Sequence, residues 1–136
     1  MSGLIGGAGS KSGIIGETEI DYEEGTWTPT FNNVDARKAR YIKVGKWVHC
    51  WGWIRPSGGN DGLNKAGLPF TTMGNEDGQD NALGGGTVTF QNQASGETWS
   101  VLVSDSSKTW NFYYASTSKE LTSGASAHFF LSYRIA

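Results

Sequence analysis

The stretch WVHCWGWIR, residues 47–55, decides the fold class because its two sets of alternate positions differ sharply in character. Its even positions are small or aliphatic, and its odd positions are mostly aromatic or charged: Val48, Cys50, Gly52 and Ile54 against Trp47, His49, Trp51, Trp53 and Arg55. Successive side chains of a β-strand point to opposite faces. The stretch therefore predicts a strand with an aliphatic core side and an aromatic outer side.

Similar short runs, separated by glycine-rich segments, recur through the rest of the chain. They predict strands at residues 26–31, 40–44, 68–72, 87–91, 98–104, 109–115 and 127–135, with a turn at Gly45-Lys46 and a long loop over residues 74–86. The last strand alternates as residues 47–55 do, with Phe129, Leu131, Tyr133 and Ile135 on one face. We expect an all-β, jelly-roll-like β-sandwich of about eight strands over residues 21–136, preceded by an extended Gly-rich N-terminal arm, residues 1–20.

Composition excludes several classes of protein. The chain has 136 residues, which suits one domain, and a formal net charge of −2, which argues against a general nucleic-acid binder. Its one cysteine allows no intrachain disulfide, so the chain can mature in a reducing cytosol. No apolar run reaches the ~20 residues of a membrane helix, and the N-terminus does not resemble a signal peptide. We expect neither nucleic-acid binding nor membrane insertion.

The N-terminal arm carries a repeat, because SGLIG at residues 2–6 recurs as SGIIG at residues 12–16. Neither the Walker spacing nor the dinucleotide spacing of glycines is matched, so a phosphate site is not expected. The four apolar residues of the repeat, set in flexible glycine, instead suit insertion into recesses of another protein. These candidate anchor residues are Leu4, Ile5, Ile14 and Ile15. The alternative is an arm folded back on its own domain.

The aromatic outer side of residues 47–55 needs an explanation, since a strand with an aliphatic core side has no further interior to fill. It is either an oligomer interface, together with Tyr113 or Phe130, or a platform for sugar rings. Both readings use the same candidate residues: Trp47, His49, Trp51 and Trp53.

Catalytic and metal chemistry find little support. Adjacent carboxylates such as Glu23 and Glu24 point to opposite sides of an extended chain, so they cannot form the facing pair of a glycosidase. His49 and His128 belong to different strands, and Cys50 lies on the face opposite His49. The acidic stretch NEDGQDN, residues 75–81, lacks the spacing of an EF-hand. We expect no enzyme activity, no metal and no cofactor.

Four short motifs have a specific order and spacing. The first is DYEEGTWTP: Asp21, Tyr22, Glu23, Glu24, Gly25, Thr26, Trp27, Thr28 and Pro29. YIKVG follows at residues 41–45, GLPFT at residues 67–71, and FLSYRI at residues 130–135. In the first motif we expect Asp21, Glu23 and Glu24 to be solvated, and Trp27 to enter the core beside Pro29.

Together these motifs resemble a module that recurs in phage tail fibres and other virion appendages, over about residues 21–136. The resemblance implies an all-β domain, commonly a homotrimer, carried on a virion and often associated with host recognition. In large fibres the module ends a long shaft, whereas here a short arm precedes it. We therefore expect a structural subunit such as a fibre, spike or capsid-decorating protein, made in the host cytoplasm and docked by its arm on another virion protein. The alternative is a receptor- or glycan-binding tip that contacts a host surface glycan.

Overall fold

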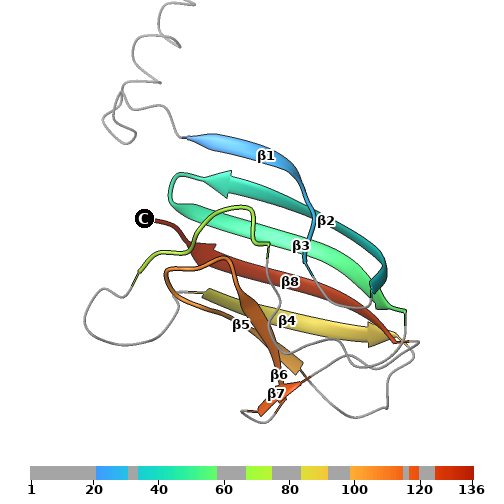
Figure 1. The fold of residues 1–136 in the computed structure, drawn as a ribbon. Helices are drawn as coiled ribbons and strands as arrows, with labels where there is room; N and C mark the ends of the chain where they lie inside the picture. Colours follow the sequence, from blue (N-terminus) through green and yellow to red (C-terminus); the bar gives the residue numbers. More distant parts are fainter. Residues whose placement is uncertain are drawn as a thin grey trace, which may run out of the picture.

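The computed structural model describes residues 21–30, 34–57, 67–74, 84–91, 99–114, 117–119 and 125–136. The strands are β1 Tyr22–Trp27, β2 Val34–Val44, β3 Trp47–Pro56, β4 Gly84–Gln91, β5 Trp99–Val103, β6 Trp110–Tyr114, β7 Thr117–Lys119 and β8 Ser126–Arg134. All eight belong to one sheet in the order β1-β2-β3-β8-β4-β5-β6-β7, and all pairings are antiparallel (Figure 1). The predicted all-β fold is confirmed. The arm, including Leu4, Ile5, Ile14 and Ile15, lies outside the described residues, as does the stretch 75–81.

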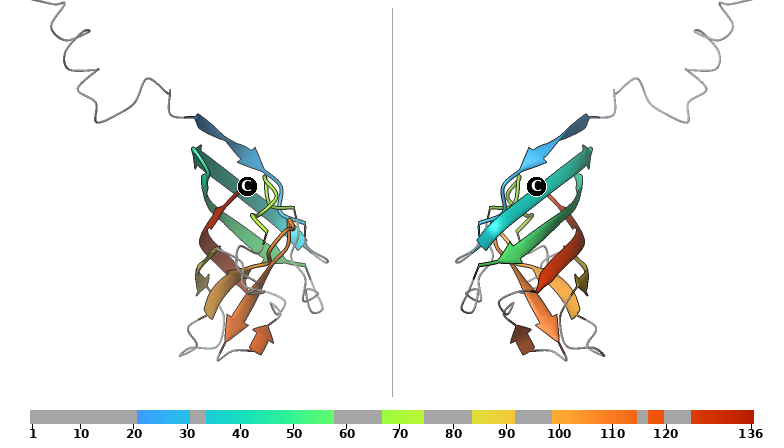
Figure 2. Two further views of the ribbon diagram at one scale, coloured as in Figure 1. Left: turned by 90° about the vertical axis from the view of Figure 1, so that its left-hand side faces the viewer. Right: turned by 90° about the vertical axis from the view of Figure 1, so that its right-hand side faces the viewer.

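The sheet curls so that its two ends face each other across one core, and Figure 2 shows this curvature from both sides. Two strands separate β6 from β8 in the sheet, yet the ring of Trp110 on β6 lies 4.8 Å from that of Phe129 on β8. Trp110 also lies edge-on to Trp27 of β1, with ring centroids 6.2 Å apart. The facing layers of the sandwich are therefore parts of one continuous sheet.

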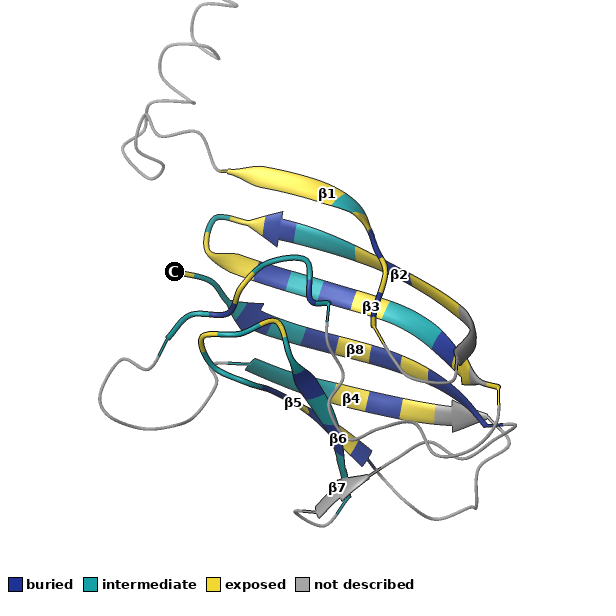
Figure 3. Ribbon diagram, in the orientation of Figure 1, coloured by how far each residue is buried: buried dark blue, intermediate teal, exposed yellow. Residues whose placement is uncertain are grey.

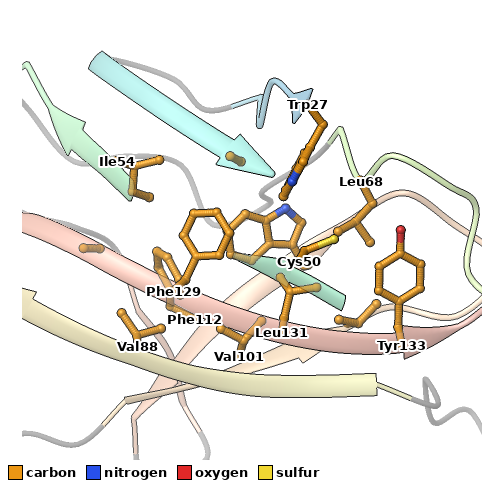
Figure 4. Close-up of a cluster of buried hydrophobic side chains, with 14 of the residues drawn as sticks. Trp27, Cys50, Ile54, Leu68, Val88, Val101, Phe112, Phe129, Leu131 and Tyr133 are labelled. Atoms are coloured by element: carbon orange, nitrogen blue, oxygen red, sulfur yellow. The ribbon is translucent and has the colours of Figure 1, made fainter. Parts of the chain in front are cut away.

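The alternation predicted for the longest strands is confirmed. Val48, Cys50 and Ile54 of β3 are buried, and Phe129 and Leu131 of β8 lie beside them in register. Figure 3 shows buried and exposed residues alternating along both strands, and Figure 4 shows the buried side chains meeting in one interior. Trp27 and Pro29 are also buried, as the first motif predicts.

The β2–β3 hairpin has the two-residue turn that the sequence predicts. Val44 pairs with Trp47, which leaves Gly45 and Lys46 in the loop. Gly45 has a φ of +56°, a conformation that glycine adopts without steric cost. This turn fixes the register of β2 against β3, so that Arg40 lies opposite Trp51 and Lys38 opposite Trp53.

The expected strand at residues 68–72 is wrong. Residues 67–74 form an extended segment whose backbone N–H groups donate to two separate parts of the chain, to the carbonyls of Ser107 and Lys108 in the β5–β6 turn and to that of Arg134 at the end of β8. Pro69 contributes no N–H, and no single neighbouring strand offers a ladder. The segment instead closes one end of the core, where Leu68 is buried.

Three strands begin several residues from the expected position. The sequence predicts a loop over residues 84–86, but these glycines open β4, because Gly84 and Gly86 approach β8 closely and Gly85 approaches β5. A Cβ on Gly86 would lie 1.8 Å from the carbonyl oxygen of Phe130, so only glycine fits there. β1 begins at Tyr22 rather than at Thr26 and β2 at Val34 rather than at Arg40, and the sequence does not predict the short strand β7.

Candidate functional site: an aromatic face and a cationic groove

The outer face of the sheet carries the exposed large apolar side chains of the described residues. There are six, and the strand register places all of them on this one face: Tyr22, Val44, Trp47, Trp51, Leu102 and Phe130. Tyr22, Val44 and Trp47 are neighbours on β1, β2 and β3, and Trp51 pairs with Phe130 across β3 and β8. An apolar face of this extent marks an interaction surface.

A groove of about 750 Å³ lies at one end of this face, over β1, β2, β3 and β8. The residues that line it are Thr26, Trp27, Thr28, Arg37, Lys38, Ala39, Arg40, Trp51, Gly52, Trp53, His128 and Phe129. The side chains of Trp27, Ala39 and Phe129 are buried in the core. The groove therefore opens on the outer face, between the side chains that alternate with them.

Basic and aromatic side chains are paired across this groove. Arg40 lies opposite Trp51 and Lys38 opposite Trp53 in the β2–β3 register. The Arg55 guanidinium carbon lies 5.9 Å from the centroid of the Trp53 ring, and the centroid of the His128 ring lies 6.5 Å from it. Trp53 thus contacts two neighbours of its own face.

A smaller hollow of about 240 Å³ adjoins the groove and shares Thr26, Arg40 and Trp51 with it. Glu24 lines this hollow and accepts a hydrogen bond from the Tyr22 hydroxyl at 3.1 Å. That hydrogen bond raises the pKa of the Tyr22 hydroxyl, because it stabilises the protonated phenol. The outer face therefore offers a carboxylate beside the cationic groove.

The acidic residues of the first motif are exposed, as expected, and they hold β1 on β2. Asp21 forms an ion pair with Lys43, and Glu23 accepts a hydrogen bond from the Tyr41 hydroxyl at 2.6 Å. Glu24, in contrast, lines the outer hollow. By the register, the two adjacent carboxylates lie on opposite faces of β1, so they do not form a facing pair.

The histidine and cysteine side chains are dispersed. His49 lies half-buried on the outer face, with its Nδ1 atom 3.0 Å from the Ser132 hydroxyl oxygen. Cys50 is buried on the inner face, and burial raises the pKa of its thiol to about 12. Within the described ranges, no three His, Cys, Asp or Glu side chains gather as metal ligands would. No described helix is long and apolar enough to cross a membrane.

The structure thus separates the four candidate residues of β3. Trp51 and Trp53 line the groove, whereas Trp47 lies at the opposite end of the strand and His49 between them. Sequence reasoning missed the contributions of Lys38, Arg40 and His128. The signal available for the first two was their alternation on β2, in the same phase as the tryptophans of β3.

Comparisons with protein-family models, with curated proteins and with solved structures find no match. The resemblance to the phage appendage module therefore rests on the sequence motifs alone.

Proposed function

We propose that this chain is a non-enzymatic structural subunit of a phage virion, a fibre, spike or capsid-decorating protein. It assembles as a homotrimer through the outer face of its sheet and docks on another virion protein through its N-terminal arm. The observation that carries the assembly is the gathering on one face of all six exposed large apolar side chains of the described residues. The virion and the number three come from the resemblance to the appendage module.

The exposed apolar surface gives association a driving force comparable to its cost. The six side chains are between 37% and 58% exposed, so each has about half of its surface left to bury. Full burial of a large apolar side chain is worth about 1.5–3 kcal/mol, so covering the remaining half of six supplies roughly 4–9 kcal/mol per subunit. Association itself costs an estimated 4–15 kcal/mol. Assembly is then marginal, and one charged substitution in the face should abolish it.

Light scattering of purified protein tests the assembly. We expect wild-type protein to be a trimer at micromolar concentration, and Trp47→Glu to be a monomer with an unchanged circular dichroism spectrum. Lys108→Glu is the matched control, because it introduces the same carboxylate at an exposed position of the β5–β6 turn. A wild-type monomer, or a trimeric Trp47→Glu variant, would contradict the proposal.

Docking through the arm has a separate test. The double change Ile14→Asp with Ile15→Asp should leave the domain folded and trimeric while releasing it from particles. Because one arm pays a large entropic cost on ordering, three arms presented together should hold better than one. Wild-type occupancy of the double variant on purified particles would rule out the anchor.

The second candidate function is a receptor- or glycan-binding tip. The observation that favours it is the groove, in which Trp51, Trp53, Lys38 and Arg40 lie on one face. The two functions share Trp51 and otherwise use different parts of the outer face, since Trp47 lies at the end of β3 opposite Trp53.

A further inference from the structure

We propose that the groove over β1, β2, β3 and β8 binds an acidic saccharide. A sugar ring stacks on Trp53 or Trp51, and its carboxylate or sulfate pairs with Lys38 and Arg40. This inference deepens the second candidate function by naming the chemical class of the ligand. It does not rest on assembly through the Trp47 end of the face, although Trp51 belongs to both surfaces.

The tryptophans supply a prepared stacking surface. Trp51 and Trp53 are two positions apart on β3, so their side chains leave the same face about 7 Å apart. Gly52 between them belongs to the inner face, so no side chain separates the two rings. Trp53 contacts Arg55 and His128. Because its position is already set, little conformational entropy is lost when a ring stacks on it.

Two basic side chains give the groove a preference for anionic ligands. Lys38 and Arg40 lie directly across from the two tryptophans. Neither has an ion-pair partner among the described residues, and none of the residues that line the larger groove is acidic. In a chain whose formal net charge is −2, this local excess of positive charge attracts an anionic ligand. The guanidinium of Arg40 also matches a carboxylate or sulfate with two parallel hydrogen bonds.

A saccharide fits this surface better than a nucleic acid does. Glu24 lines the hollow next to Arg40, where a carboxylate accepts hydrogen bonds from sugar hydroxyls. A DNA chain, in contrast, has no free hydroxyl along its backbone to donate to this carboxylate. An acidic saccharide combines hydroxyl donors, flat apolar ring faces and anionic groups. The volume of the groove, about 750 Å³, lies in the usual range for a ligand site.

The test is isothermal titration of the full chain with four probes of similar length. They are an oligomer of glucuronate, a sulfated oligosaccharide, a neutral oligomer of glucose and single-stranded oligothymidylate. We expect one or both acidic saccharides to bind, and the neutral one to bind at least about 10-fold more weakly. Raising the salt from about 0.1 M to about 1 M, which shortens the screening length from ~10 Å to ~3 Å, should weaken acidic binding strongly.

Three variants and one control test whether the ligand binds in the groove. Lys38→Gln and Arg40→Gln should each lower the affinity for the acidic saccharide about 10-fold or more, because a charge-assisted hydrogen bond is lost. Trp53→Ala should lower it about 5- to 10-fold. Lys46→Gln, which removes the same charge at the β2–β3 turn, should leave it unchanged.

Four results would overturn the proposal: no binding of either acidic saccharide, equal binding of the neutral one, tighter binding of oligothymidylate, or equal effects of Lys38→Gln and Lys46→Gln. Light scattering on the same samples measures the oligomeric state, so a failure of saccharide binding can be distinguished from a failure of trimer assembly. A trimer that binds no saccharide refutes the groove alone, whereas a monomer that binds one refutes only the assembly.

Discussion

Replacing Tyr133 by phenylalanine should loosen the segment that closes the core. The Tyr133 hydroxyl is buried at the end of β8 and makes two hydrogen bonds to Phe70, which belongs to the segment 67–74. It donates to the carbonyl oxygen of Phe70 at 3.1 Å and accepts from the Phe70 N–H at 3.2 Å. One side chain thus satisfies both backbone groups of a residue that belongs to no strand.

The size of the effect follows from those two contacts. A hydrogen bond contributes about 0.5–1.5 kcal/mol net, so losing two costs about 1–3 kcal/mol. Phe70 is half-buried, so water can replace part of what is lost. The aromatic ring itself is retained, so its packing in the core is kept. We expect Tyr133→Phe to lower the free energy of unfolding by about 1.5–2.5 kcal/mol.

Urea unfolding followed by tryptophan fluorescence measures the change. The midpoint should fall while the m-value stays constant, since the surface exposed on unfolding is the same. Hydrogen exchange at the Phe70 amide should accelerate more than exchange within β3. Tyr113→Phe is the matched control, and its half-buried hydroxyl on the outer face should change stability by less than ~0.5 kcal/mol. Equal, small effects of the two substitutions would refute the role assigned to Tyr133.

Three further predictions concern the core. Burial raises the pKa of Cys50 from 9.0 to about 12 and also raises that of Tyr133. The unfolded chain therefore loses these protons at a lower pH than the folded chain does. The free energy of unfolding should then fall as the pH rises above about 9, and urea midpoints that rise there would contradict this. Gly86→Ala should abolish folding, because the new Cβ would meet backbone of β8, and a native circular dichroism spectrum would show that β4 can shift. Thr72→Val should lower the free energy of unfolding by about 1–3 kcal/mol. The buried Thr72 hydroxyl donates to the Ser104 carbonyl oxygen at 2.6 Å and accepts a hydrogen bond from the Ser107 N–H in the β5–β6 turn. An unchanged thermal midpoint would disprove this.

The strands with clear alternation could be read from the sequence. In β3 and β8 the inner positions are aliphatic or aromatic and the outer positions are mixed, so a period of two identifies both the strand and its core side. The burial of Trp27 and Pro29 could be predicted for a similar reason. These features depend on the order of residues within one segment, which is visible in the sequence.

Features that depend on distant backbone could not be read in this way. The composition of residues 67–74 resembles that of an edge strand, but the segment donates backbone hydrogen bonds to two different parts of the chain, the β5–β6 turn and the end of β8. The glycines at residues 84–86 resemble a loop, yet close approach to β8 makes them a strand. The groove draws on four strands, and its pairing of Lys38 and Arg40 with the tryptophans follows from the register of β2 on β3.

The position of β8 has a consequence for how the chain reaches its fold. Among the described strands β8 is the last in the sequence, but it lies between β3 and β4 and joins the two halves of the sheet (Figure 1). While the chain is being made, β1–β3 can pair as a meander, but its free β3 edge and apolar inner face stay uncovered until β8 arrives. Pairings so distant in sequence form slowly. During synthesis the nascent chain therefore has a window in which a chaperone, or another unfinished copy, competes with its own last strand for the β3 edge.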